Sequence, residues 1–458
     1  MDAGTSSSAA ASARGEAGGG DSSHPPSQRR VDWDEGLAGT DLRDARVRRF
    51  FGRVRGVGEA VDGDELPVVL APMAHAGHLP LRLLALNHGA AAVFSEELVA
   101  LRLRHVTRED NVELGTIDYY AAGSREALPA LVYRTCAMER GRNVLQLGAA
   151  GAVEAVEAAL EFARDVAGVD INMGCPESSS MSGGMGSALL ARPDVACEIL
   201  SSLRRALPED MTVTCKIRLM EDARRSVDVV RKFEKAGASA VIVHARRVDQ
   251  RPREPARWSE LAPIVQAATV PIVANGDVFS FEDAVRLARM TGAASCMAAR
   301  GAIGDPAAPF ARRRLRDTHS SVLSYRSARH VADEYLAASE LCDNALPVDK
   351  WFLAQVPRYR REPESQVLGP ALATAEDADA VLAAFGLPSR LGRAQCWAGV
   401  SGERTATQWR AAFSRALSVV AVFPTPAASP LLPPAKLLRE CAPECGDDMR
   451  GCDSGWAR

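Results

Sequence analysis

The chain has no apolar run that approaches the roughly 20 residues a membrane-spanning helix needs. Residues 1–26 are rich in Ser, Ala and Gly, and they lack the apolar core of a secretory signal. Asp2, Glu16 and Asp21 argue against an organelle transit peptide, so we expect disorder there. Ten cysteines without a secretory signal favour reduced thiols and a cytoplasmic location.

A strong net charge and a metal-binding cysteine pattern are also missing. The net charge of −3 gives no global attraction to nucleic acid, so any RNA contact must depend on local basic patches. Cys441, Cys445 and Cys452 do not form a paired C-x-x-C pattern, so we expect no zinc and no other metal. What is present is a composition of 47% hydrophobic and 25% charged residues, typical of a globular protein, over 458 residues that allow more than one domain.

The most informative stretch is residues 169–176, followed by the glycine-rich run 182–187. The first three residues are typical of the end of a buried strand. Gly174 and Pro176 interrupt that strand, which places Cys175 at its C-terminal end. A thiol at such a place is a candidate acid or nucleophile, whereas a free Cys taken alone is more often a small buried residue.

Short apolar runs alternate with helical patterns over about 240 residues, which predicts an α/β fold with a (β/α)₈ TIM barrel. A doubly wound open sheet is the alternative, but it has no reason to stop at eight strands. The expected strands are residues 66–73, 90–94, 143–148, 168–172, 212–218, 240–244, 271–276 and 293–299. The expected helices are 79–86, 152–166, 193–206, 223–236, 258–267 and 281–289.

The pattern outside the barrel predicts three further segments. Residues 1–65 are expected to be a disordered linker with a short helix near 43–55, before a barrel at 66–316. Residues 317–390 are expected to form a small all-helical domain, with helices at 326–341, 350–360 and 375–385. Residues 391–458 are expected to be an irregular tail that contains one helix, 407–420.

The ends of the predicted strands carry polar residues, and in a TIM barrel this rim holds the active site. Gln146, Lys216 and His244 sit in apolar strands, where they are costly unless they share a polar ligand. Gly276 and Gly301 follow strands seven and eight, the common phosphate site of these barrels, although each alone could be an ordinary turn glycine. Together they indicate a phosphate-bearing aromatic cofactor, and flavin mononucleotide (FMN) fits.

Each rim residue has an expected role toward FMN or the substrate. Lys216 would stabilise negative charge on the reduced flavin ring, and Arg300 would lie near the phosphate. The residues expected to hold the cofactor are Ala71, Pro72, Met73, Gln146, Lys216, His244, Asn275, Gly276, Asp277, Ala299 and Arg300. The residues expected to bind substrate are Asn172, Arg218 and Arg246.

Several motifs run through the predicted barrel in order: Leu-Ala-Pro-Met at 70–73, Gln146, Ile-Asn-Met-Gly-Cys-Pro at 171–176, Gly-Gly-Met-Gly-Ser-Ala-Leu-Leu at 183–190, Cys-Lys-Ile-Arg at 215–218, Val-His at 243–244 and Ala-Asn-Gly-Asp at 274–277. With these motifs the chain resembles the tRNA-dihydrouridine synthase family. The resemblance covers the whole barrel and extends to residues 383–387. Residues 79–86 and the double glycine are similar to the eukaryotic tRNA-dihydrouridine(20) synthase branch.

The resemblance implies an FMN-bound barrel that reduces a uracil ring in the tRNA D loop, with NADPH or NADH regenerating the flavin. Hydride would go to C6, and Cys175 would be the catalytic acid that protonates C5. Asn172 would hold the uracil edge, and the base must be extruded to reach the flavin. The implied partner is tRNA, and we expect a monomer that binds neither membrane nor metal.

The chain departs from that branch in the loop after Cys175. Glu177 and Ser182 stand where family members usually carry basic residues, and His75 stands where Arg is usual. Residues 429–441 faintly resemble the start of a double-stranded-RNA-binding domain, but too few residues follow for the module. RNA binding would then fall to the helical domain, through a basic face of Lys350, Arg358, Arg360 and Arg361. The alternative for those four charges is an ordinary solvated surface.

Two other functions stay open at this point. One is a flavin barrel that acts on a free pyrimidine. Activity of the purified protein on free uridine would indicate this function. The other is a non-catalytic RNA-binding protein of the same fold, motivated by the missing basic loop residues, for which the purified protein would be colourless.

Overall fold

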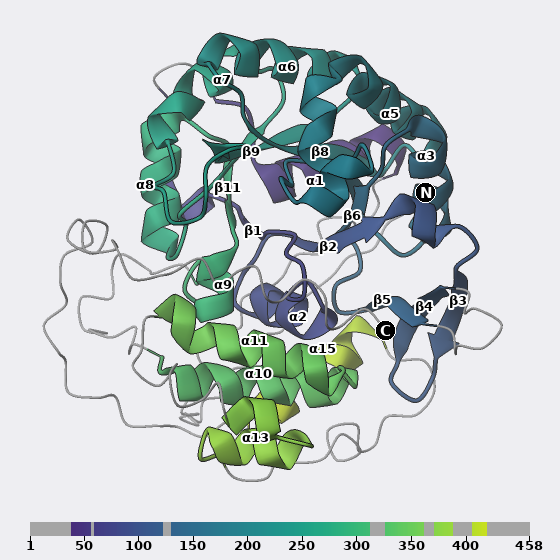
Figure 1. The fold of residues 1–458 in the computed structure, drawn as a ribbon, viewed down its shortest axis with the longest axis vertical. Helices are drawn as coiled ribbons and strands as arrows, with labels where there is room; N and C mark the ends of the chain where they lie inside the picture. The colour runs from purple at the N-terminus through teal and green to yellow at the C-terminus, as the bar shows by residue number, and fades with distance from the viewer. Residues whose placement is uncertain are drawn as a thin grey trace, which may run out of the picture. The chain divides into compact units, whose positions relative to one another are not determined.

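The computed structural model describes residues 38–55, 59–121, 130–311, 326–360, 371–387 and 405–418. Residues 1–26, expected to be disordered, and the three C-terminal cysteines lie outside these residues. Eight parallel strands close into a barrel in the order β1-β11-β10-β9-β8-β7-β6-β2 (Figure 1), which confirms the predicted TIM barrel. They are β1 (Val68–Leu70), β2 (Val93–Val99), β6 (Asn143–Gly148), β7 (Gly168–Met173), β8 (Thr212–Leu219), β9 (Ala240–Arg247), β10 (Ile272–Asn275) and β11 (Ser295–Ala298).

The end of the barrel where the strands begin is filled by apolar side chains. Phe50 and Phe51 of α1 (Gly39–Phe51) are fully buried, and they cluster with strand residues such as Val69 and Ile242. The hydroxyl of Ser295, the first residue of β11, lies 3.4 Å from the Phe50 carbonyl. The short helix predicted near residues 43–55 is present as α1, but it is not part of a linker, because it contributes two aromatic rings to the barrel core.

Helices follow the strands as predicted. They are α2 (Leu79–Asn87), α3 (Ala152–Phe162), α5 (Pro193–Ala206), α6 (Ala223–Lys235), a 3₁₀ turn (Trp258–Leu261) continued by α7 (Ala262–Ala267), α8 (Phe281–Thr291) and the short α9 (Arg300–Gly304). Their starts have sequence-encoded caps in two cases: Asp222 accepts from the Arg225 amide, and Ser280 with Asp283 forms a capping box.

A three-stranded antiparallel sheet, which the sequence did not predict, is inserted between β2 and β6. It consists of β3 (Thr107–Asn111), β4 (Thr116–Ala121) and β5 (Ala130–Cys136), in the order β3-β4-β5. The second barrel strand was predicted at residues 90–94, which is too early in the chain, since β2 begins at Val93 and extends to Val99. β3 is Thr-Arg-Glu-Asp-Asn, so it carries no apolar alternation from which a strand could be predicted.

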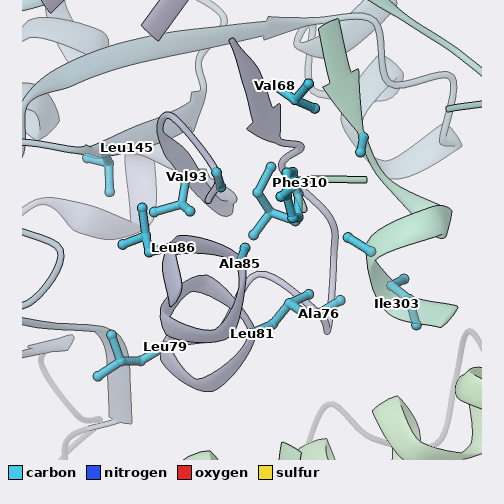
Figure 2. Close-up of a cluster of buried hydrophobic side chains, with 14 of the residues drawn as sticks. Val68, Ala76, Leu79, Leu81, Ala85, Leu86, Val93, Leu145, Ile303 and Phe310 are labelled. Atoms are coloured by element: carbon cyan, nitrogen blue, oxygen red, sulfur yellow. The ribbon is translucent and has the colours of Figure 1, made fainter. Parts of the chain in front are cut away.

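The helices after the barrel include α10 (Ala328–Cys342), α11 (Leu346–Arg360), α13 (Ala378–Ala384) and α15 (Ala406–Ser418). α10 packs against α2 and α15, and α11 packs against α9 (Figure 1). Figure 2 shows the apolar cluster around α2, where Leu86 lies beside Val93, and Phe310 and Val68 belong to the same cluster. α2 thus has one side against the barrel and another against the helical region.

Polar contacts tie the inserted sheet to these helices. Arg134 of β5 binds the Asp118 carboxylate at 2.6 Å and donates to the Cys342 carbonyl at the end of α10 at 2.7 Å. Trp409 of α15 donates from its indole nitrogen to the Gly115 carbonyl at 2.7 Å. Among the described residues, no helix is long and apolar enough to cross a membrane.

Candidate active site

A cavity of about 130 Å³ lies at the C-terminal rim of the barrel strands. Nine of the eleven residues predicted to hold a cofactor line it: Ala71, Pro72, Lys216, His244, Asn275, Gly276, Asp277, Ala299 and Arg300. Arg218 and Arg246, predicted to bind substrate, line it as well. Met73, Gln146, Asn172 and Cys175 are not part of the lining. The structure therefore brings most of the predicted site together, because these residues follow neighbouring strands at one end of the barrel.

The cavity carries an excess of positive charge. Four cationic side chains line it, and Asp277 is the one carboxylate among the lining residues. Asp277 has a left-handed backbone, with φ of +55°. Its Oδ1 accepts from Arg246 at 2.6 Å and from Arg300 at 2.8 Å, which leaves Lys216 and Arg218 without a carboxylate partner among the lining residues. Such a cavity suits a ligand with a phosphate or another anion.

His244 is the neutral member of this set. Burial first, and then the surrounding cations, hold its pKa well below the ordinary value, so the imidazole is uncharged at neutral pH. Its Nε2 lies 3.2 Å from a guanidinium nitrogen of Arg246, which can only donate. Nε2 is therefore the acceptor, and the ring proton sits on Nδ1, where it is available as a donor.

Lys216 makes no hydrogen bond to any described residue. Burial, followed by repulsion from Arg218, lowers the pKa of its ammonium to about 8, so it remains largely protonated at pH 7. A partly buried ammonium without a partner is unfavourable unless a polar ligand completes it. The prediction that Lys216 lies beside the polar edge of a cofactor fits this environment.

Position 276 in the cavity wall requires a glycine. Its φ of +123° is a conformation that residues with a side chain rarely adopt, and an added Cβ would lie 3.0 Å from Ala256 and 3.3 Å from His244. The turn is held in place because the indole of Trp258 donates to the Gly276 carbonyl at 2.9 Å. Gly276 is therefore more than an ordinary turn glycine, since any side chain would push into the cavity-lining His244.

The loop that follows β7 presents Cys175 beside this cavity. Asn172 Oδ1 accepts from the amides of Gly174 at 3.0 Å and Cys175 at 3.1 Å, and Ser187 donates its amide to the Cys175 carbonyl at 2.9 Å. Cys175 is half-buried, and burial raises the pKa of its thiol above the ordinary value. The thiol is therefore neutral at pH 7 and holds a proton that it can donate.

The two arginines predicted to bind substrate are engaged within the protein. Arg218 donates to the Gly174 carbonyl at 2.8 Å and to the Gln250 carbonyl at 3.2 Å, so it joins the Cys175 loop to the loop after β9. Arg246 is almost completely buried and binds Asp277 and the Glu254 carbonyl. Asn172, the third predicted substrate ligand, uses its amide oxygen to shape the Cys175 loop. These contacts are within the protein, and the substrate-binding roles of the three residues stay predictions.

Two carboxyl groups at the site were missed in the sequence. Glu97 enters the barrel because an irregularity in β2 shifts its register between Phe94 and Glu97, so simple alternation would have placed Glu96 inside instead. Its carboxyl group hydrogen-bonds Asn172, and burial raises its pKa. Asp170 is fully buried between Gln146 and Thr214. A charged residue in the apolar run 168–172 was the available signal for Asp170.

Two of the four residues in the basic face predicted for the helical domain bond to the protein itself. Lys350 donates to the carbonyls of Ala373 and Ala375, each at 3.0 Å. The side chain of Arg360 is largely buried and donates to the Gly304 carbonyl at 3.3 Å. Arg358 is exposed, and Arg361 lies outside the described residues.

Comparison with known proteins identifies the family. Residues 69–322 match the family model described as dihydrouridine synthase (Dus), which is more than half of the chain. The chain belongs to the dihydrouridine synthase family. The motifs at 70–73, 171–176 and 274–277, which carried the resemblance in the sequence, all fall within the matched residues.

Three curated relatives of the Dus family have the following matches. The tRNA-dihydrouridine(20) synthase of Saccharomyces cerevisiae is 38% identical over 218 residues, which cover 46% of this chain and 57% of that protein. The enzyme of the same name from Schizosaccharomyces pombe is 37% identical over 243 residues, which cover 51% of this chain and 50% of that protein. A tRNA-dihydrouridine(16) synthase of Cupriavidus necator is 39% identical over 140 residues, which cover 30% of this chain and 44% of that protein. The chain thus spans about half the length of the curated relatives it matches.

Proposed function

We propose that this Dus-family chain is a tRNA-dihydrouridine synthase that reduces the C5–C6 bond of a uridine in the tRNA D loop. The observation that carries the proposal is Cys175, whose neutral thiol lies on the loop beside the cationic rim cavity. Position 20 is the proposed target because the two yeast relatives have that position in their names. The proposed reductant is NADPH or NADH, in line with the NAD(P)+ in the same names.

FMN is the proposed cofactor, and the residues present fit it. The wall formed by the cationic Arg300, the neutral His244 and the Gly276 turn would hold its phosphate, and Lys216 would lie at the polar edge of its ring. FMN bound there would supply the hydride that C6 of uracil accepts. The protein's own residues would supply orientation and the proton.

Cys175 is proposed as the acid that protonates C5. Hydride addition to C6 leaves negative charge on the enolate formed by C5 and the C4 carbonyl, and a proton on C5 completes the reduction. A neutral thiol can provide that proton, whereas a thiolate cannot. Asn172 and Arg218 would keep the loop in the conformation that directs Cys175 to the substrate, through their contacts with Gly174. These features support an active enzyme over a non-catalytic protein of the same fold.

The proposed partner is tRNA, and the proposed location is the cytoplasm. The target uridine would be extruded from the D loop to reach the rim, as in other enzymes that act on bases. Glu177 and Ser182 lie at the two ends of the short helix α4 (Ser178–Ser182) next to Cys175, and both are exposed, so this segment is a surface that an approaching RNA can contact. The expectation of a monomer stays a prediction.

The purified protein is expected to be yellow and to release FMN, not FAD. The reason is that the rim cavity offers one cationic region for a phosphate, and the chain has no G-x-G-x-x-G turn for a dinucleotide. Denaturation followed by chromatography of the supernatant identifies the flavin. Release of FAD, or failure to take up free FMN, would contradict the proposed cofactor.

The double substitution Glu177→Lys with Ser182→Lys is expected to raise kcat/KM on tRNA by about fivefold to tenfold, because the added positive charge near tRNA phosphates, screened by solvent, stabilises the complex by about 1 kcal/mol in total. The salt dependence should steepen, and single-turnover reduction at saturating tRNA should stay nearly unchanged. Steady-state and single-turnover kinetics at two salt concentrations measure both effects.

Glu161→Lys is the control for this pair, since it adds positive charge at the exposed end of α3. We expect it to change kcat/KM much less than the double variant. If the double variant shows no gain at low salt, the Cys175 loop does not face RNA.

A further inference from the structure

One layer of polar residues crosses four neighbouring strands just beneath the rim cavity. Glu97 of β2 is the register partner of Gln146 on β6, and Gln146 is the partner of Asp170 on β7. Asp170 in turn is the partner of Thr214 on β8. Lys216 lies two residues further along β8, on the same face, and it lines the cavity. The layer is therefore directly connected to the proposed cofactor site.

Asp170 is the centre of this layer and is completely buried. Gln146 Nε2 donates to Asp170 Oδ2 at 2.7 Å, and Thr214 Oγ1 donates to Asp170 Oδ1 at 2.7 Å. The Gln146 backbone is also fixed, because its amide donates to the Ser95 hydroxyl at 2.9 Å. Both oxygens of the carboxylate thus have a neutral donor, and neither donor cancels its charge.

These bonds determine which end of the Gln146 amide can meet a ligand. A carboxylate can only accept, so the nitrogen of Gln146 must face Asp170. The amide oxygen Oε1 accepts no hydrogen bond from a described residue. Gln146 is therefore oriented as an acceptor for a ring N–H, and the orientation depends on Asp170.

We propose that Asp170 is a positioning residue for the bound flavin: it orients the Gln146 carbonyl toward the N–H of the ring's amide edge, and its negative charge offsets Lys216 and thereby lowers the flavin's reduction potential. The inference rests on the flavin site of the proposed function. The other ionisable groups near Asp170 are Glu97 of β2 and the buried thiol of Cys215 on β8. Neither supplies a positive charge, so Lys216 is the cation that Asp170 balances.

Asp170→Asn separates the two roles, because asparagine keeps an acceptor oxygen for Gln146 while it removes the charge. We expect this variant to bind FMN and to shift the reduced-to-oxidised ratio of the flavin about tenfold toward the reduced form, which is about 30 mV for a two-electron couple. Asp170→Ala removes the acceptor as well, and its FMN affinity should fall at least about tenfold, roughly what one lost buried hydrogen bond to a charged group costs. Thr214→Val leaves the charge in place and should leave the potential at pH 8 unchanged.

Dye-linked spectroscopic titration of the flavin, combined with FMN-binding measurements, tests the proposal. A potential for Asp170→Asn equal to that of the wild type, with FMN bound, would show that Asp170 is structural only.

If Asp170→Asn does not fold, the potential of the wild type is followed between pH 5 and 8. Burial raises the pKa of Asp170 to about 6, so the potential should show an additional rise as the pH falls through that value. Thr214→Val should move this step to higher pH, because it removes a hydrogen bond that favours the ionised carboxylate. Absence of the step in the wild type would contradict the proposal. Wild-type protein that binds no flavin would overturn the proposed function and this inference together.

Discussion

Cys175→Ala is expected to reduce dihydrouridine formation by at least about a hundredfold, in the range that loss of a general acid produces. The thiol is the neutral proton donor on the loop after β7, and no other described thiol lies on that loop. FMN should remain bound and NADPH should still reduce it, because Cys175 does not line the cavity proposed for the cofactor. Stopped-flow reduction of the flavin and mass spectrometry of the tRNA product measure the two steps separately.

Cys197→Ala is the matched control, since Cys197 is also a half-buried thiol but lies on α5, away from the rim. It should retain both steps. If Cys175→Ala lost flavin reduction to the same extent as dihydrouridine formation, Cys175 would be a structural residue, and the proposed acid would have to be sought elsewhere.

Glu139→Ala is expected to lower the free energy of unfolding by about 3–5 kcal/mol, as removal of one partner of a buried ion pair does. Arg82 of α2 binds both carboxylate oxygens of Glu139, at 2.8 and 2.9 Å, and both side chains are buried. The alanine would leave the Arg82 guanidinium buried and without its counter-charge. Thr135 would lose its acceptor as well, since its hydroxyl donates to Glu139 at 2.7 Å.

Urea denaturation of the two proteins measures this difference, and Glu221→Ala provides the comparison. Glu221 pairs with Arg225 on the surface, where an exposed pair contributes about 1 kcal/mol or less. Equal losses for the two variants would mean that the buried pair does not hold the inserted sheet against α2.

Much of the barrel could be predicted because its strands are short apolar runs bounded by turn residues. The predicted strand 143–148 and the predicted helix 193–206 coincide with β6 and α5. The strand β3 could not be found, because its five polar residues form a partly exposed edge with no apolar period. The burial of Phe50 and Phe51 could not be predicted either, since it depends on tertiary contacts with strands far along the chain.

The candidate site was predictable where side-chain alternation and strand ends determine position. Lys216, His244 and Asn275 face the cavity for that reason. Glu97 was missed because the irregularity in β2 changes the alternation, and no local pattern in the sequence marks it. The hydrogen bonds from Arg218 to backbone carbonyls could not be predicted either, because they depend on how two separate loops meet.

Reduction of a tRNA transcript by the purified protein is the most direct test of the proposed activity. An unmodified transcript is incubated with the protein, FMN and NADPH, and dihydrouridine is mapped by mass spectrometry, with free uridine as the parallel substrate. We predict dihydrouridine at one D-loop position of the transcript and none from free uridine. Reduction of free uridine, or a flavin-bound protein that leaves the transcript unchanged, would contradict the proposed function.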